Sequence, residues 1–392
     1  MRVFSRLMVV GILFTVLQVC TYAQVITTAV PDLLIAPDSR AGAMGESGVG
    51  LANNSSAIFW NPAGIAFLDG QEVSITHSNW LPQFQLDLSY DYLSFRQYLP
   101  DFNGSIFSSI MYFDNGEFVR TGPSGPTPIG TFTSYDLAIT AGYATQLSDD
   151  WGIGFNFRFI RSELAPAGTG DEVGSGISNN ISFDIGAMWR PETLVLPFID
   201  YDMGKSISFG VNLSNLGPKM YYIDEAQADP LPTNLRIGFA YQLLNDEYNS
   251  FILTCDFNKL MVSESAAPND STAISKPFYQ ALFTSWSAPS LSAELQLIQT
   301  SVGLEYWYGT PGDFLFALRA GYFYEDPSQG GRKFVSFGAG IRYDLYGFDF
   351  SYITTSILPN NQDSPLDNTL RFTLNIGWGG NPGNERNLPR GI

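Results

Sequence analysis

Runs of about ten residues, in which large apolar side chains alternate with small or polar ones, recur along the chain from residue 71 onward. In one of them Trp151, Ile153 and Phe155 share a face, while glycine, asparagine and arginine take the positions between the apolar ones. Successive side chains of a strand point to opposite faces, so the pattern predicts strands with a bulky apolar face and a compact polar face. Lipid outside and a filled or wet lumen inside would select such strands.

The number and spacing of these runs favour a closed barrel. The runs span residues 71–78, 84–95, 104–113, 132–145, 151–161, 180–189, 205–214, 233–243, 249–258, 300–308, 314–324, 334–344, 347–356 and 369–378. Bacterial outer-membrane barrels have an even number of antiparallel strands, with long outer loops and short periplasmic turns. If the first strand runs outward, five of the seven outer connections exceed ten residues, and only one inner connection, 190–204, is long. We therefore predict an all-β fold, a 14-stranded antiparallel transmembrane β-barrel, in preference to a soluble sandwich.

The start of the chain and its composition predict export to the outer membrane. Residues 1–23 combine two arginines, an apolar run and small residues before the expected cleavage after Ala23, as a secretory signal peptide does. A lipoprotein signal ending at Cys20 is the alternative, disfavoured by the bulky Val19 before it. With 20 Lys+Arg against 38 Asp+Glu, the chain lacks the basic surface that binds nucleic acid. No later stretch is long and apolar enough for a membrane-spanning helix.

Charged residues within the runs fall on the face opposite the large apolar side chains. They are Arg158, Arg236, Arg319, Arg342, Arg371, Asp87, Asp136, Asp184, Asp256, Glu305, Asp344 and Asp349. An arginine facing lipid near the midplane would cost about 2 to 4 kcal/mol, so we expect these side chains in the lumen. Pairing with one another and with a plug is the simplest role, and an ion or substrate path is the alternative.

Residues 24–69 do not alternate and are rich in small side chains. Their notable positions are Asp38, Arg40, Gly42, Gly45, Asn61 and Pro62. Small residues followed by Asn-Pro suit short helical turns in a restricted space. We therefore divide the chain into a signal peptide (1–23), an N-terminal hatch or plug (24–69), a barrel (70–378) and a polar periplasmic tail (379–392).

Several stretches match motifs of known families. They are Leu33–Gly45, Asn61–Gly64, Phe316–Pro327, Asp349–Tyr352 and Asp367–Leu374. The Asn-Pro-Ala-Gly stretch is similar to the hatch of the FadL family of outer-membrane transporters for hydrophobic compounds. The first stretch resembles more closely the opening of the PorV (LptO) family, outer-membrane proteins of the Bacteroidetes type IX secretion system. The chain departs from that family at Asn61–Phe67, where Ala63, Gly64 and Ile65 stand in place of bulkier basic and aromatic residues.

The resemblance implies a non-enzymatic shuttle in the outer membrane. Such a protein receives secreted cargo by its C-terminal domain from the translocon barrel and delivers it to the surface sortase or attachment complex. Outer-membrane lipid and lipopolysaccharide would surround it. The alternative function is a FadL-like channel for hydrophobic small molecules, which would require an apolar pocket in the lumen.

Residues for catalysis or metal binding are scarce. His77 is the only histidine, and its position on the first predicted strand, on the face of Val73 and Ile75, favours an interfacial or structural role. One histidine and the single cysteine beyond the signal peptide, Cys255, exclude a His-rich zinc site and a thiolate cluster. We therefore expect no catalytic residue, cofactor or metal. A lipid A-modifying enzyme is disfavoured because a second histidine is absent.

Two expected outer loops are candidates for partner contacts. At the end of the loop 259–299, Leu291, Leu295, Ile298 and Val302 have near-helical spacing and predict a short amphipathic helix at the outer rim. That helix would be either a lid or a docking surface for cargo or translocon. The loop 114–131, rich in proline and glycine, is expected to be semi-rigid and polar.

Overall fold

The computed structural model describes residues 28–122, 125–165, 175–195, 197, 202–265, 274–310, 312–358 and 364–380, without the side chains of residues 122 and 126. The predicted signal peptide lies outside the described residues. Of the predicted polar tail, the described residues include Gly379 and Gly380.

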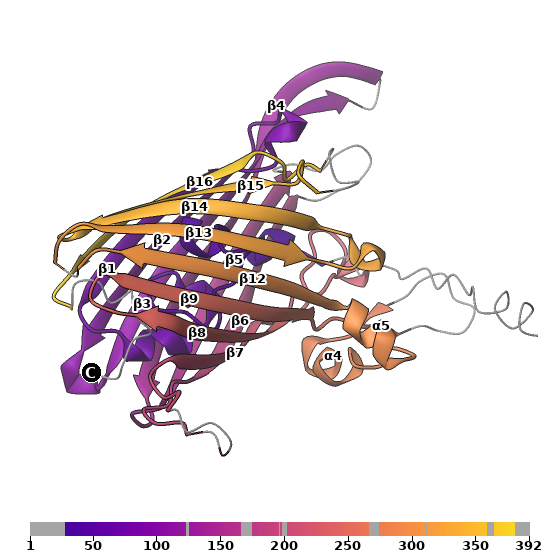
Figure 1. The fold of residues 1–392 in the computed structure, drawn as a ribbon. Helices are drawn as coiled ribbons and strands as arrows, with labels where there is room; N and C mark the ends of the chain where they lie inside the picture. The colour runs from indigo at the N-terminus through magenta and orange to yellow at the C-terminus, as the bar shows by residue number, and fades with distance from the viewer. Residues whose placement is uncertain are drawn as a thin grey trace, which may run out of the picture.

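Fourteen antiparallel strands close into one barrel within these residues (Figure 1). They are β1 (Gln71–Asn79), β2 (Ser89–Leu99), β3 (Gly104–Gly122), β4 (Gly125–Gln146), β5 (Trp151–Ala165), β6 (Gly176–Trp189), β7 (Ile207–Leu216), β8 (Asn234–Asn245), β9 (Asn249–Leu260), β12 (Ile298–Tyr308), β13 (Leu315–Tyr324), β14 (Lys333–Tyr343), β15 (Tyr346–Thr354) and β16 (Thr369–Trp378). Each strand pairs with the next of this series, and β1 pairs with β16 to close the barrel. The predicted fold is confirmed, and each predicted run overlaps one barrel strand.

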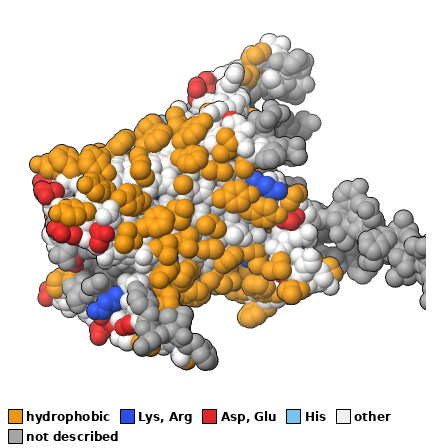
Figure 2. Space-filling view, viewed as in Figure 1, with side chains coloured by type: hydrophobic (Ala, Val, Ile, Leu, Met, Phe, Trp, Pro, Cys, Tyr) orange, Lys and Arg blue, Asp and Glu red, His pale blue; other side chains and the backbone are white. Residues whose placement is uncertain are grey.

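The two faces of the wall differ as the alternation predicts. In β5, Phe155, Phe157 and Phe159 are exposed on the outside, whereas Asn156 and Arg158 between them are buried. Figure 2 shows hydrophobic side chains over much of the outer wall, with acidic side chains gathered at one end. No helix among the described residues is both long and apolar enough to cross a membrane. Outward-facing side chains of the strands form the apolar outer surface.

The two ends of the barrel have different connections. The end that we call the short-turn end carries brief links such as residues 147–150 and 246–248. The opposite end, called the helical end, carries a long excursion between β9 and β12. The excursion contains the two-stranded sheet β10 (Glu264–Ser265) and β11 (Ile274–Ser275) and the helices α4 (Phe278–Thr284) and α5 (Leu291–Gln296). Further 3-10 turns are η3 (Pro82–Phe84), η4 (Pro100–Phe102), η5 (Glu225–Gln227) and η6 (Pro327–Gln329).

The predicted positions of two acidic side chains in the lumen were wrong. Asp87 is exposed in the connection before β2, because η3 occupies the start of the predicted run and delays the strand to Ser89. Asp344 is exposed in the turn between β14 and β15, where its φ of 52° lies in the left-handed region that aspartate tolerates. Alternation alone does not mark where a strand gives way to a turn.

The predicted loop 114–131 is also wrong, because β3 and β4 continue through it as a hairpin that projects beyond the barrel (Figure 1). Glu117 pairs with Thr133 in the ladder, and the rings of Phe118 and Phe132 stack with centroids 5.7 Å apart. Pro128 has no N–H to donate, which an edge strand tolerates. This part of β4 pairs with β3 but not with β5, so Pro128 has a neighbouring strand on one side only. We call residues 115–134 the projecting hairpin.

Residues 28–69, called here the inner segment, lie inside the barrel against its inner wall (Figure 1). Their turns are η1 (Pro31–Leu34), α2 (Ser39–Gly42), α3 (Ala57–Trp60) and η2 (Pro62–Phe67). Element η2 packs against β4, β5 and β6, and α2 packs against β14, β15 and β16. The segment enters at the helical end, where the Ala29 N–H donates to the Pro230 carbonyl, and leaves at the short-turn end into β1.

Candidate functional site

Glycines on the inward face of the wall leave room for the inner segment. A Cβ at Gly321 would lie 2.0 Å from the Gly45 backbone nitrogen, and one at Gly154 would lie 2.4 Å from the Pro62 carbonyl carbon. At Gly152, Gly154, Gly186, Gly210, Gly238, Gly303 and Gly321, a Cβ would lie within 3.2 Å of a backbone atom of the inner segment. At Gly338 it would lie 2.4 Å from the Ala43 Cβ. Backbone thus packs directly on backbone around much of the barrel. The inner segment fits only because these positions carry no side chain.

A buried chain of ion pairs ties the inner segment to the wall. Arg40 donates from Nε and Nη2 to the two Glu305 carboxylate oxygens, at 2.7 and 2.6 Å. Arg319 donates to Glu305 at 2.6 Å and to Asp349 at 2.7 Å. Arg342 donates to Asp349 at 2.6 Å. Arg40 comes from α2 and the other four residues come from strands, so this ion-pair chain fixes the position of α2 in the lumen.

Asp38 and Asn61 organise the turns of the inner segment. Asp38 accepts the Ala41 N–H at 2.9 Å as the N-cap of α2, and it accepts the Trp60 indole N–H at 2.7 Å. Asn61 accepts the Ala63 N–H at 3.2 Å at the start of η2, where Pro62 occupies the first helical position.

Gly42 and Gly45 are close-approach positions. A Cβ on Gly42 would lie 2.5 Å from the Arg371 guanidinium, which donates to Glu46 at 3.3 Å. Gly45 has a φ of 68° and donates its N–H to the Ser336 hydroxyl at 2.8 Å. A side chain at either position would displace the inner segment from β13–β16.

Polar side chains of the wall satisfy the backbone of the inner segment. Asp256 accepts the N–H groups of Gly48 and Val49 at 2.7 and 2.8 Å. Arg236 donates to the Phe59 carbonyl at 3.2 Å, and its guanidinium carbon lies 4.2 Å from the centroid of the Phe59 ring. Short turns leave backbone groups without internal partners, so the wall supplies them.

A second buried cluster lies within the wall at the junction of β5, β6 and β7. Arg158 donates to Asp184 at 2.7 Å and also contacts the Asn215 amide oxygen. Asp184 accepts the Asn215 N–H at 2.7 Å, beside the irregular pairing of β6 and β7. Asp136 accepts from Asn115 at 3.1 Å.

Most of the charged side chains that were predicted to face the lumen are buried inside the barrel. Arg158, Arg236, Arg319, Arg371, Asp136, Asp184, Asp256, Glu305 and Asp349 are buried, and Arg342 is half-buried. Most of these side chains bind one another or the inner segment. The arrangement is suited to fixing the inner segment.

His77 lies on the outer face of β1 and forms an exposed pair with Asp91 at 2.7 Å. Its other ring nitrogen lies 3.2 Å from the Asn79 amide oxygen. These contacts supply no serine nucleophile for the histidine. Within the described residues, no group of three or more His, Cys, Asp or Glu could hold a metal ion.

A cavity of about 860 Å³ opens at the helical end. Its apolar lining includes Leu34 and Ile35 of the inner segment, Trp80 from the connection after β1, and Leu297 beside α5. Glu325 lies on its rim, paired with Arg332 at 2.9 Å. The cavity is within the size range of ligand pockets, and its apolar lining combined with a few charges suits an amphipathic group.

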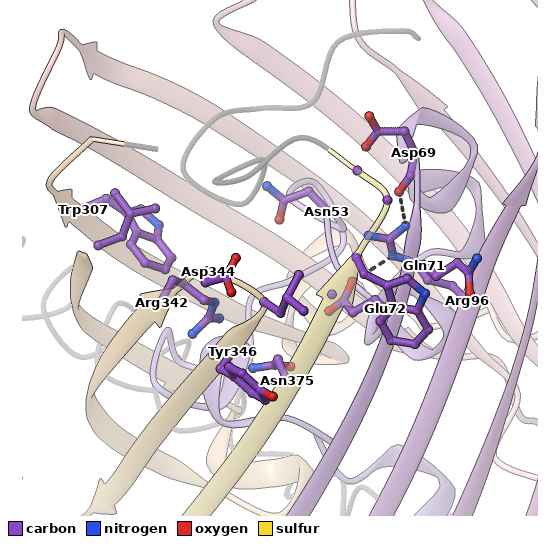
Figure 3. A pocket seen from close by; sticks show the side chains of 17 residues that line it. Asn53, Asp69, Gln71, Glu72, Arg96, Trp307, Arg342, Asp344, Tyr346 and Asn375 are labelled. Carbon is purple, nitrogen blue, oxygen red and sulfur yellow. Dashed lines mark hydrogen bonds and ion pairs between the residues drawn. The ribbon is translucent and has the colours of Figure 1, made fainter. Parts of the chain in front are cut away.

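A smaller cavity of about 160 Å³, lined by both charged and aromatic residues, lies at the short-turn end (Figure 3). In Figure 3, Arg96 donates to the Glu72 carboxylate and to the Asp69 carbonyl, each at 2.8 Å. Asn53 of the inner segment also lines this cavity. The two cavities share no lining residue, and the inner segment contributes to both.

The predicted partner-facing residues separate in the structure. Leu291 and Leu295 are exposed on one face of α5, which ends at Gln296. Ile298 is the first residue of β12 and Val302 also lies in that strand, so the assignment of both to the helix was wrong. Sequence reasoning missed the exposed apolar side chains of the projecting hairpin, although the alternation around Phe118 and Phe132 could have revealed them.

Comparison with known proteins identifies one family by sequence. The profile of the family described as "Type IX secretion system protein PorV" matches residues 19–267, more than half of the chain. A search of curated proteins found no significant match.

Solved outer-membrane barrels resemble the chain in fold. The Ralstonia pickettii toluene transporter TbuX has 11% identity and a TM-score of 0.44, with 88% of this chain and 97% of that chain covered. A Pseudomonas aeruginosa FadL homologue has 12% identity and a TM-score of 0.48, with 88% and 98% covered. Identities this low concern the fold alone and carry no information about a ligand.

Proposed function

Because the chain belongs to the PorV family of type IX secretion system proteins and forms an outer-membrane barrel, we propose that it is a cargo shuttle without enzymatic activity. In this proposal it binds the C-terminal domain of secreted cargo at the translocon barrel and delivers it to the surface sortase or attachment complex. The family match is the observation that carries the proposal.

The filled lumen supports a role at the surface rather than transport of protein through the bore. The inner segment is held by the buried Arg40–Glu305 pair and by backbone contacts with wall glycines such as Gly321. We propose that it acts as a plug, that residues 70–378 form the barrel domain, and that residues 379–392 form a periplasmic tail. A folded cargo domain would then be held outside the wall, at the rim.

The projecting hairpin is our candidate for the cargo contact. Among the described residues, the ladders of β3 with β2 and of β4 with β5 end at Ser89–Asp114 and Tyr135–Glu163, and beyond these pairs the hairpin strands pair with each other. The outer edges of the hairpin therefore present backbone N–H and C=O groups that lie outside any of these ladders. An unpaired edge is a template for strand addition. Val119 and Ile129, about 60% exposed, supply apolar contacts beside these edges.

The double variant Val119→Asp/Ile129→Asp is expected to reduce cargo recovery at least tenfold when the protein is affinity-purified from native outer membrane. Each substitution would put a charge into an apolar contact, and a tenfold loss corresponds to about 1.4 kcal/mol. The measurement is quantitative mass spectrometry of co-purifying proteins that share the C-terminal domain.

Leu147→Asp is the matched control, because Leu147 is 65% exposed but lies at the short-turn end. It should leave cargo recovery unchanged. Equal cargo recovery with the hairpin variant and with the wild type would show that cargo does not bind at the hairpin. Absence of both cargo and a large translocon barrel from the wild-type preparation would refute the shuttle function itself.

The 860 Å³ cavity keeps one alternative open, a FadL-like channel for hydrophobic small molecules. Solvent extraction of the same purified barrel, followed by mass spectrometry of small molecules, tests it. A stoichiometric hydrophobic compound together with no co-purifying cargo would favour the channel.

A further inference from the structure

Lys259 occupies an unusual place on the barrel. It belongs to the outward-facing row of β9, two positions after Phe257, and it pairs across the sheet with Leu235 and Ile298, which also face outward. A lysine in this row would be expected to meet lipid or water, yet its side chain is only 4% exposed. Something on the outside of the wall must cover it.

The helices α4 and α5 provide that cover. Glu294 of α5 accepts a hydrogen bond from the Lys259 ammonium at 3.0 Å, and the ring of Trp286, between the helices, lies 4.9 Å from the same nitrogen. Glu294 also accepts the Ala288 N–H at 2.8 Å. The excursion therefore folds back over the outer side of the wall.

The side of this helical pair that faces away from the barrel is apolar. Tyr279 and Phe283 lie four residues apart on α4, and Leu291 and Leu295 lie four residues apart on α5. All four are exposed, Phe283 at 81% and Leu291 at 76%. Spacing by four places each pair on one helix face.

The same stretch carries no charge. From residue 277 to residue 293 there is no Asp, Glu, Lys, Arg or His. The Lys259–Glu294 ion pair that anchors the helices is covered beneath them. A water-facing lid would be expected to carry charges on its outer side, whereas the outer side of α4 and α5 carries aromatic and aliphatic side chains and Glu294 turns toward the wall.

The apolar face is also continuous with the outer wall. Phe257 of β9 and Val302 and Leu304 of β12 are exposed apolar side chains on the strands that flank the excursion. Figure 2 shows hydrophobic side chains over the outer wall toward the helical end. The environment that covers the wall therefore extends over the helices.

We propose that α4 and α5 form an interfacial element embedded in the outer leaflet of the membrane, with their exposed apolar faces in contact with lipid. Tyr279 and Trp286, which have both an apolar body and a polar tip, suit the boundary between acyl chains and headgroups. The Lys259–Glu294 pair holds the helices down against the wall. This inference does not depend on which cargo the protein binds.

Site-directed spin labelling of the full mature chain in lipid vesicles tests the proposal. Phe283→Cys and Leu291→Cys, each in a Cys255→Ser background, would carry the nitroxide. Phe257→Cys reports a wall position, and Ile129→Cys reports the projecting hairpin in water. The expected result is that both helix labels, like the Phe257 label, collide more with oxygen than with a water-soluble nickel chelate, while the Ile129 label does the reverse.

The proposal is overturned if the helix labels favour the nickel chelate, which would make the helices a water-facing surface available to a protein partner. Shielding from both reagents in vesicles that contain only this protein would also overturn it, because a second copy would then cover the face. In addition, Lys259→Gln should release the helices and raise nickel accessibility at Leu291 severalfold. Unchanged nickel accessibility at Leu291 would show that the Lys259–Glu294 pair does not anchor the helices.

Discussion

Replacing Glu305 by glutamine should lower the free energy of unfolding of the barrel by about 3 to 5 kcal/mol, the usual cost of removing one partner from a buried ion pair. The Glu305 carboxylate accepts from Arg40 and from Arg319, and all three side chains are buried. The substitution would leave two guanidinium groups close together without the anion between them. Urea unfolding in lipid vesicles, followed by tryptophan fluorescence and by the gel shift of the folded barrel, would measure the change.

The chain offers a matched control for that experiment. Glu192 pairs with Lys205 at 2.9 Å, but both side chains are 43% exposed. Exposed pairs contribute about 0 to 1 kcal/mol, so Glu192→Gln should be nearly silent. The double variant Arg40→Met/Glu305→Gln should be less destabilised than the sum of its single variants, because Arg40 would no longer be an orphaned charge. Strict additivity would mean that the two side chains act independently.

The alternation of the sequence was enough to predict the barrel and the number of its strands, because each strand has lipid-compatible and lumen-compatible faces with a period of two. The same period reports only which face a side chain takes. It could not reveal that Asp87 precedes its strand, or that β3 and β4 continue as the projecting hairpin. A stretch that contains both glycine and β-branched residues is compatible with a turn and with a strand, so its composition does not distinguish the two.

The sequence also did not predict that α5 covers part of the outer face of the wall. The pattern around Lys259 places its side chain outward but does not indicate that Glu294, 35 residues later, returns to bind it. In the same way, Arg40 was a recognisable motif position, whereas its bond to Glu305 joins residues 265 apart. Contacts of this separation depend on how the barrel closes, so they follow from the fold rather than from local spacing.

Replacing Gly321 by valine should displace the inner segment and open the barrel to ions. A Cβ at this position would lie 2.0 Å from the Gly45 nitrogen and from the Met44 carbonyl carbon, both of which are backbone atoms that cannot rotate away. Valine suits a strand, so pairing of β13 with β12 and β14 should persist. We expect long-lived openings in planar lipid bilayers where the wild type is closed, and faster proteolysis of residues 28–69 in folded barrels.

Gly377→Val is the control for Gly321→Val. It shows whether valine in a strand opens the barrel even where it does not contact the inner segment. A Cβ at Gly377 in β16 would meet only the Gln71 carbonyl oxygen, at an ordinary 3.7 Å, and no atom of the inner segment. This variant should stay closed. If Gly321→Val also stayed closed and kept wild-type stability, backbone contact with the wall glycines would not be what seats the inner segment. The buried Arg40–Glu305–Arg319 contacts would then have to hold it alone, and openings should appear in Glu305→Gln instead.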